Sequence, residues 1–348
     1  MTTTDANAPG STTTAQQYHH LRRTVGVYAP GAGLVAVTGL ERGVVLGRVL
    51  ARDSEYVEPN TARDTLVLNE DGTVWDAVIH IELDDTSWLI SQSRADLAEL
   101  LRGAAEGLDD VAVADAGGEQ EAVSFEGPKA WKIAEKLVDF EVSSLVLHGV
   151  AVVEPPAASG EVGVLARIGT TGEYGYVLVA PRSAEAAAWV LEQADALGGG
   201  AVAPEALSRA RAEVRHPQIP VSSKGLSVRE AGMEWLVSWN REDEFRGGTA
   251  LVQTPEPERG LIHLTGAAGC PPVAGAAIYA GDQTVGTVRE VFPTAGTADE
   301  LVLGLLTKPF DIPGLPLRST GADGSEVELR TVAAPFVVPQ SWSERIGA

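Results

Sequence analysis

The chain has 348 residues, of which 44% are hydrophobic and 21% are charged, the composition of an ordinary globular protein with two or three domains. Its formal net charge of −22, from 26 basic and 48 acidic residues, argues against nucleic acid or an anionic membrane surface as a main partner. A single cysteine, Cys270, excludes an internal disulfide and a cysteine-based metal cluster, and it fits a reducing compartment.

No segment of the sequence has the pattern of a signal peptide or of a membrane helix. A charged N-terminal region with an apolar core is missing, and the uncharged segment 264–281 contains Pro271-Pro272 and four glycines. We therefore expect a soluble, cytoplasmic protein. Because no exposed apolar stripe is recognisable, we expect a monomer.

Residues 1–17 are polar and rich in threonine, and we expect them to form a disordered tail. From Tyr18 onward, hydrophobic periods of two and 3.6 residues alternate, which predicts α+β layers. A helix at 183–197 is expected to have Ser183 as its cap and glycines at its end. The other expected helices are 41–50, 95–107, 128–138 and 204–215, and the expected strands are 33–39, 64–69, 74–83, 87–92, 121–125, 162–168 and 175–180.

After residue 258 the pattern changes to strands separated by Gly, Pro and Asp. The stretch "YAGDQTVG" predicts a hairpin with Gly281-Asp282 at its tip. Few helical patterns occur in this part of the chain. We therefore expect a C-terminal β barrel or roll.

An aspartate, Asp76, interrupts the apolar strand in "LVLNEDGTVWDAVIHIEL" (66–83). At period two, Trp75 and Ala77 begin one apolar face, whereas Asp76 lies between two valines on the other face. An ionised carboxylate is costly there if it is buried and nothing pairs with it. Two interpretations stay open: a functional carboxylate, or one that is hydrogen-bonded to the backbone or paired with His80 on a partly solvated face.

Motifs for nucleotides, serine nucleophiles and metals are missing from the sequence. It contains no Walker loop, no GxSxG and no HExxH. The glycines of "GTTGEYGY" (169–176) have the wrong spacing for a phosphate loop and predict a hairpin turn instead. The pair His19-His20 has no ligand partners at metal spacing, so we expect no metal site.

Several motifs, taken in order, resemble those of the glycine-cleavage T-protein (aminomethyltransferase) family. Each is weak alone, but their order and spacing extend from residue 18 to residue 336. They are "LNEDGTVWDAV", "FEGPKAWKIAEKL", "GTTGEYGYVLV", "EALSRARAEVRHP", "EAGMEWLVSWNREDEFRGGTAL", "GAAIYAGDQTVGTVREVF" and the closing "AAPF".

The resemblance implies a fold of three domains around a central channel. Two α+β domains of ferredoxin-like type would occupy residues 18–258, and the β barrel would occupy 259–348. Family members bind tetrahydrofolate in the channel and transfer a methyl or methylene group from a small-molecule donor.

The resemblance also implies roles for individual residues. Asp76 matches the family's catalytic aspartate, which would orient the folate and handle the proton on its N5 atom. Arg211 would anchor a carboxylate of the folate or of the donor. The residue-level alternative for Arg211 is a helix-surface ion pair with Glu213 or a neighbouring residue. Further candidate positions for folate contacts are Tyr176, Glu173, Trp75, Asp64 and Val177.

The sequence departs from the family pattern in the expected pocket. Val177 stands where the family has a glutamate that grips the pterin ring, and Asp64 replaces a tyrosine. The second aspartate of the family's Asp-Asp pair is Ala77, and Thr170 replaces another tyrosine. Loss of a charge-assisted hydrogen bond of this kind costs about 1.5–3 kcal/mol unless another group substitutes.

Three functions therefore stay open at this level. The first is a folate-dependent one-carbon transferase acting on a small molecule. The second is an enzyme of the same fold that does not use folate, in which Asp76 is a general acid or base; Val177 and Asp64 favour it. The third is a non-catalytic binding protein, against which the retained Asp76 argues.

Overall fold

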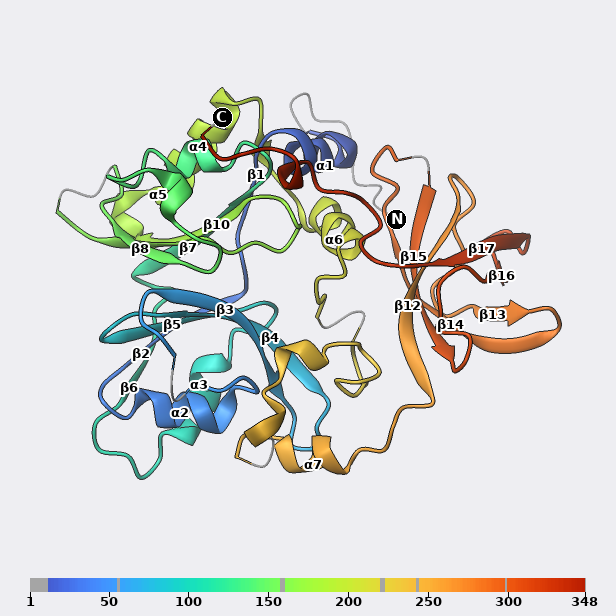
Figure 1. Cartoon of the computed structure of the whole chain (residues 1–348), viewed down its shortest axis with the longest axis horizontal. Coiled ribbons are helices and arrows are strands. Elements are labelled where there is room, and N and C mark those ends of the chain that lie inside the picture. Colours follow the sequence, from blue (N-terminus) through green and yellow to red (C-terminus); the bar gives the residue numbers. More distant parts are fainter. Residues whose placement is uncertain are drawn as a thin grey trace, which may run out of the picture.

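The computed structural model has three lobes, two built on open sheets and one on a closed barrel (Figure 1). It describes residues 12–54, 57–156, 160–219, 223–241, 244–297 and 299–347. Helix α6 (Pro204–Glu213) lies at the centre of Figure 1, between the upper sheet lobe and the barrel.

The lower lobe is a five-stranded antiparallel sheet covered on one face by two helices. Its strand order is β3 (Thr61–Leu68), β4 (Val74–Glu82), β5 (Thr86–Ser91), β2 (Gly33–Thr38) and β6 (Ala112–Asp115). The covering helices are α2 (Arg42–Val49) and α3 (Leu97–Ala104).

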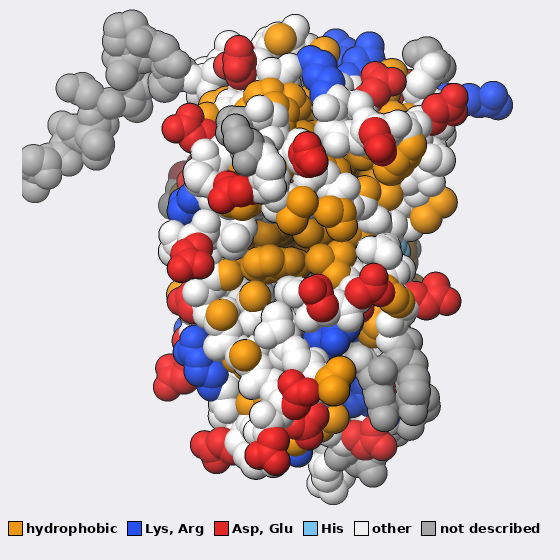
Figure 2. Space-filling view, turned by 90° about the vertical axis from the view of Figure 1, so that its left-hand side faces the viewer, with side chains coloured by type: hydrophobic (Ala, Val, Ile, Leu, Met, Phe, Trp, Pro, Cys, Tyr) orange, Lys and Arg blue, Asp and Glu red, His pale blue; other side chains and the backbone are white. Residues whose placement is uncertain are grey.

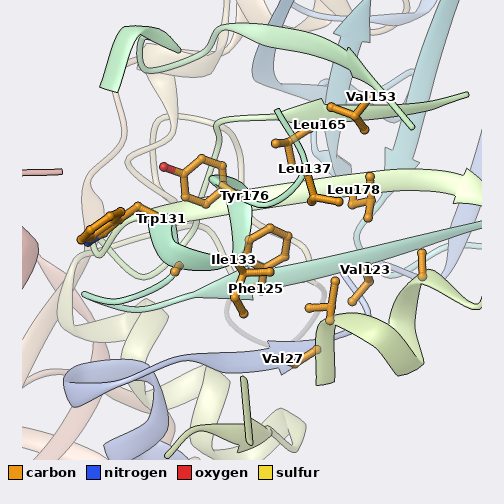
Figure 3. Packing of buried hydrophobic residues seen from close by; sticks show 14 of the residues in the cluster. Val27, Val123, Phe125, Trp131, Ile133, Leu137, Val153, Leu165, Tyr176 and Leu178 are labelled. Carbon is orange, nitrogen blue, oxygen red and sulfur yellow. The ribbon is translucent and has the colours of Figure 1, made fainter. Parts of the chain in front are cut away.

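The upper lobe is a six-stranded mixed sheet. Its order is β11 (Gly200–Ala201), β1 (Gly26–Tyr28), β7 (Gln120–Glu126), β10 (Gly175–Pro181), β9 (Gly163–Ala166) and β8 (Val150–Val153). Helices α4 (Trp131–Ala134) and α5 (Ala186–Ala196) pack on its outer face, over a core in which Phe125 stacks on Tyr176 with ring centroids 5.4 Å apart (Figure 3).

The two sheets share one apolar layer, which confirms the apolar face expected for the strand at 74–83 for Ile79 and Ile81 but not for Trp75, which packs in the cluster on the helix-covered side of the lower sheet. Ile79 and Ile81 of β4 belong to the same buried cluster as Val164 and Val177 of the upper sheet. Figure 2 shows hydrophobic side chains gathered at mid-height of the left-hand face, the level at which one sheet lies above the other in Figure 1. The inner faces of the two sheets therefore join the two lobes.

The barrel lobe confirms the expected C-terminal β structure. Its closed order is β12 (Arg259–Ala267), β15 (Asp299–Thr307), β14 (Gln283–Phe292), β13 (Ala277–Ala280), β16 (Pro316–Thr320) and β17 (Glu326–Val332). Ala280 pairs with Gln283, so Gly281-Asp282 forms the tip of the predicted hairpin, and Gly281 has φ +59°.

The chain after β17 leaves the barrel and returns to the upper lobe, as the dark red trace in Figure 1 shows. Glu173 holds it there by accepting hydrogen bonds from the backbone N–H groups of Gln340 (3.1 Å) and Ser341 (2.9 Å) and from the Ser341 hydroxyl (2.6 Å). Two connections therefore join the upper lobe to the barrel lobe. One is the C-terminal strap, residues 333–347, and the other is α6, which packs against β14.

Three local expectations were wrong. Helix α1 (Thr14–Arg23) begins inside the expected tail, because Thr13 and Gln16 form a reciprocal capping box. Helix α5 begins at Ala186 rather than at 183, since residues 182–184 form a 3₁₀ turn and the Ser183 hydroxyl donates to Glu161 instead of capping. Helix α4 spans only residues 131–134, whereas a helix over residues 128–138 was expected.

Candidate functional site

One cavity of about 590 Å³ draws its walls from all three lobes, and we call it the central cavity. The upper lobe contributes the end of β1 and α6, the lower lobe contributes residues 29–32 and Gln92, and the barrel contributes Glu290 of β14. Its lining residues are Tyr28, Ala29, Pro30, Gly31, Ala32, Gln92, Val202, Pro204, Leu207, Ser208, Arg211, Gln218, Ile219 and Glu290.

Arg211 presents a cation to this cavity from α6. Its Nε donates to the Thr170 hydroxyl at 3.0 Å, and its guanidinium lies 5.5 Å from the centre of the Tyr28 ring. The surface ion pair with Glu213 that the sequence left open is not formed, because Glu213 faces Arg22 and Arg209 instead. Arg211 is therefore held in place by one hydrogen bond and one ring contact at the cavity wall.

Tyr28 and Glu126 form a buried polar network behind Arg211 that was not predicted from the sequence. The Glu126 carboxylate accepts hydrogen bonds from the Tyr28 hydroxyl, from the N–H of Thr170 (2.8 Å) and from the N–H of Thr171 (2.9 Å). Burial, followed by the charge of Glu126, raises the pKa of Tyr28, which stays protonated at all physiological pH values. The glycine-containing loop at 169–176 thus binds an anion of its own chain.

Asp76 is fully buried at the start of β4. Its carboxylate accepts hydrogen bonds from the Ser91 hydroxyl, from the Ser93 hydroxyl (2.9 Å) and from the N–H groups of Ser93 (3.1 Å) and Arg94 (3.2 Å). The pairing with His80 does not occur, because His80 Nε2 lies 2.9 Å from Glu82. The carboxylate itself contributes nothing to the walls of the central cavity.

The turn that Asp76 holds carries a cavity residue, Gln92. The Gln92 backbone N–H donates to the Ala77 carbonyl at 2.9 Å. Its side-chain amide donates to the Pro217 carbonyl (3.2 Å) and accepts from the Ile219 N–H (2.9 Å), so Gln92 joins the lower lobe to the segment after α6. Asp76 is thus connected to the central cavity through one intervening residue.

Comparison with known proteins decides the family. A family model described as the GCVT N-terminal domain matches residues 7–241, well over half of the chain. The chain belongs to the glycine-cleavage T-protein family.

Known aminomethyltransferases are similar to most of this chain. An aminomethyltransferase of Cutibacterium acnes is 28% identical over 299 residues, covering 80% of this chain and 79% of the relative. One from Streptomyces coelicolor is 25% identical over 316 residues, covering 87% of this chain and 84% of the relative. The crystal structure of the glycine cleavage system aminomethyltransferase T from Bartonella henselae superposes with a TM-score of 0.78 at 19% identity, over 94% of this chain and 90% of that one, which confirms the fold.

In this T-protein family member, Tyr176 and Val177 lie on opposite faces of β10. Tyr176 is fully buried in the upper-lobe core, where burial raises its pKa to about 12. Val177 lies in the apolar layer between the two sheets. Neither side chain lines the central cavity, so the contacts with a folate that we expected of them stay predictions without support from its walls.

The three other expected folate contacts are dispersed. Glu173 is engaged by the C-terminal strap and by Arg22, at 3.3 Å. Trp75 lines a cavity on the outer side of the lower lobe, with the guanidinium of Arg94 4.4 Å from its ring centre. Asp64 lies 3.9 Å from His216 Nε2, next to a small pocket behind the central cavity.

Within the described parts of the chain, no three His, Cys, Asp or Glu side chains are grouped so that they could hold a metal ion. No described helix combines the length and the apolar character that crossing a bilayer requires.

Buried His263 of β12 makes the stability of this protein depend on pH. Burial, and secondly the charge of Arg215, lowers the pKa of His263 to about 4, from 6.5 in an unfolded chain. Between these values the unfolded state binds the extra proton, so the imidazole's contribution is constant above pH 6.5 and stability falls as the pH drops towards 4. We expect the free energy of unfolding to fall between pH 7.5 and pH 5.0 by about 2 kcal/mol more in the wild type than in His263→Gln. Equal losses in both proteins would contradict a neutral, buried His263.

Proposed function

We propose that this protein is a tetrahydrofolate-dependent one-carbon transferase that acts on a small-molecule donor, with the folate in the central cavity. The observation that carries the proposal is the cation of Arg211, fixed at the wall of a cavity that all three lobes of a T-protein fold enclose. Relatives that match most of this chain are named aminomethyltransferases, which supports the same reaction class.

The residues of the central cavity suit a folate. A volume of about 590 Å³ lies within the range of roughly 300–1,000 Å³ that small-molecule sites occupy. Val202, Leu207 and Ile219 supply apolar surface for flat rings, and Arg211 supplies a planar fork for a carboxylate. Glu290 is the one carboxylate among the described lining residues, and a β-bulge between Val288 and Glu290 turns this part of β14.

When it is bound, a reduced folate supplies the N5 nitrogen that gains the one-carbon unit. The chain itself contributes binding and alignment. Arg211, backed by Tyr28 and Thr170, fixes one end of the ligand, and the apolar walls hold the other in place. Asp76 holds the turn that positions Gln92 at the cavity. A direct catalytic contact of Asp76 stays a prediction from the family resemblance.

Arg211→Gln is expected to weaken tetrahydrofolate binding 10- to 100-fold, because one charge-assisted contact is worth about 1.5–3 kcal/mol. Anaerobic calorimetric titration of both proteins measures the difference. Ser208→Ala is the matched control, since Ser208 lines the same cavity and its hydroxyl donates to the Glu205 carbonyl of its own helix. Equal affinities of the wild type and Arg211→Gln for tetrahydrofolate would show that Arg211 does not contact the folate.

A folate-independent enzyme with Asp76 as general acid or base is the second candidate. The position of Val177 in an apolar layer favours it, because the family's gripping glutamate has no equivalent there. The buried, fully engaged carboxylate of Asp76 counts against it, since a general base needs access to the proton that it removes. Absence of folate binding together with activity on a small molecule would favour this candidate.

A further inference from the structure

The C-terminal strap contacts the two elements that hold Arg211 at the central cavity. One element is α6, which carries Arg211, and the other is the loop at 169–176, in which Thr170 accepts a hydrogen bond from the Arg211 Nε. Along the chain, the strap meets the end of α6 first and the loop second. The position of Arg211 relative to Thr170 therefore depends on two elements that the strap connects.

At the end of α6, the strap binds a carbonyl two residues beyond Arg211. The Phe336 N–H donates to the Glu213 carbonyl at 2.6 Å, and the Phe336 ring centre lies 5.8 Å from the guanidinium of Arg209. Arg209 and Glu213 form an ion pair at 2.9 Å within the helix. The strap is thus fixed to the last turn of the helix that carries Arg211.

At the loop, Ser341 is the strap residue with the most contacts. Its hydroxyl donates to Glu173 at 2.6 Å and accepts from the Tyr174 N–H at 2.9 Å, and its own N–H donates to Glu173 at 2.9 Å. The Tyr174 hydroxyl donates to the Glu344 carbonyl of the strap. The buried Ser341 hydroxyl therefore makes two of the bonds that join the strap to the loop.

Arg22 connects this contact to the part of the loop that binds Arg211. One nitrogen of Arg22 donates both to the Thr171 carbonyl at 2.7 Å and to the Glu173 carboxylate at 3.3 Å. The N–H groups of Thr170 and Thr171 are in turn bound by Glu126. The loop from Thr170 to Glu173 is thus one hydrogen-bonded unit.

Gly172 lies where α6, the loop and the strap meet. It has φ +79°, and a Cβ placed on it would lie 2.9 Å from the Val214 side chain at the end of α6 and 3.0 Å from the Pro339 ring of the strap. The loop backbone is therefore in contact on two sides. A change in the position of the strap changes the position of the loop.

The strap is held less firmly than the lobes that it joins. The structure describes no strand between residues 333 and 347, and the side chains of Val338 and Trp342 are 80% and 64% exposed. Ile346 packs only partly buried against the upper-lobe core. A segment with few buried apolar contacts opens locally at a lower free energy than a packed sheet. The strap can therefore leave the loop while the three lobes stay folded.

We propose that docking of the strap and ligand binding in the central cavity are coupled, with Ser341 and Glu173 as positioning residues for Arg211. The docked strap keeps Thr170 where it accepts from Arg211, so the guanidinium is already oriented when the ligand arrives. Because such coupling is reciprocal, a ligand bound to Arg211 in turn stabilises the docked strap. Tetrahydrofolate as that ligand rests on the proposed function, whereas the effect of the strap on the loop does not.

Amide hydrogen exchange of the loop, without any ligand, tests the first half of the proposal. In Ser341→Ala the N–H groups of Thr170 and Thr171 should exchange about tenfold faster than in the wild type, since two hydrogen bonds to the strap are lost. The amides of the β7–β10 ladder should change less, because they exchange by unfolding of the whole lobe. Ser341→Thr keeps a hydroxyl and should restore slow exchange. Unchanged exchange of the loop in Ser341→Ala would overturn the proposal, whether or not the protein binds folate.

Ser343→Ala is the matched control. Ser343 belongs to the same strap, but its exposed hydroxyl donates to the Gln340 carbonyl of its own turn at 3.0 Å. Its replacement should leave both the exchange of the loop and ligand binding unchanged.

Calorimetric titration with tetrahydrofolate tests the second half. Ser341→Ala should bind about tenfold more weakly than the wild type, and the same substitution made in Arg211→Gln should cause no further loss, because the strap acts through that guanidinium. Bound tetrahydrofolate should also slow exchange of the Gln340 and Ser341 N–H groups in the wild type.

Equal affinities of the wild type and Ser341→Ala, or an additive loss in the double variant, would overturn the coupling. Absence of tetrahydrofolate binding to the wild type would instead contradict the proposed function. The positioning of the loop by the strap is then decided by the exchange measurement alone.

Discussion

Asp76→Ala is expected to lower the free energy of unfolding by about 4 kcal/mol, since it leaves buried donors without an acceptor. In the wild type the hydroxyls of Ser91 and Ser93 and the N–H groups of Ser93 and Arg94 all point at this carboxylate, which has no exposed surface. Asp76→Asn should cost about 2 kcal/mol, because one amide oxygen still accepts, without the negative charge. Urea unfolding of the three proteins measures both losses.

Asp96→Ala controls for the loss of a neighbouring carboxylate. Asp96 pairs with Arg94 at the surface, where both side chains are more than 40% exposed, so its loss should cost under about 1 kcal/mol. A loss equally small for Asp76→Ala would show that the carboxylate is solvated in solution.

The same variant separates a positioning role from a purely structural one. If Asp76 acts on the central cavity through the turn at Gln92, Asp76→Asn should weaken tetrahydrofolate binding at temperatures where it is fully folded. Gln92→Ala should reproduce that weakening without the loss of stability. An unchanged affinity for tetrahydrofolate in Asp76→Asn would show that Asp76 stabilises the fold but does not influence the central cavity.

The second large effect is expected for Glu213→Ala, with a loss of about 3–5 kcal/mol in the free energy of unfolding. Glu213 is fully buried and neutralises two guanidiniums, Arg22 at 2.8 Å and Arg209 at 2.9 Å, while it accepts from the Tyr18 hydroxyl at 2.9 Å. Removing the carboxylate leaves two cations uncompensated at the junction of α1, α6 and the barrel. Thermal and urea unfolding both report the change.

Glu205→Ala on the same helix is the control, because Glu205 is exposed in the first turn of α6 and its loss should stay within about 0.5 kcal/mol. Similar stabilities of the two variants would mean that the buried network contributes nothing net. Arg22→Ala should match Glu213→Ala in direction, since it leaves Glu213 with one of its two cations.

The strands and the barrel hairpin were predictable because their signals are local. Alternation in "VWDAVIHIEL" and the turn pair Gly281-Asp282 each depend on a few consecutive residues. The start of α1 was missed because threonines, poor helix formers, also make good caps, and Thr13 caps the helix here. Strand β11 has only two residues, too few for any period to appear.

The site was less predictable, because its contacts join residues that are far apart in the chain. The resemblance to the family brought Arg211 to notice, and the structure places it at the central cavity. Glu126 and Tyr28 are 98 residues apart, and no local pattern connects them. An acidic residue that ends the apolar strand "AVSF" just before Gly127-Pro128 was the only available signal, and it equally predicts an exposed strand end.

The measurement that tests the central claim most directly is anaerobic calorimetric titration of the wild-type protein with tetrahydrofolate. A folate held in the central cavity predicts one site per chain with a Kd in the micromolar range, about −8 kcal/mol. Absence of binding up to millimolar tetrahydrofolate would contradict the claim and leave a T-protein fold with other chemistry.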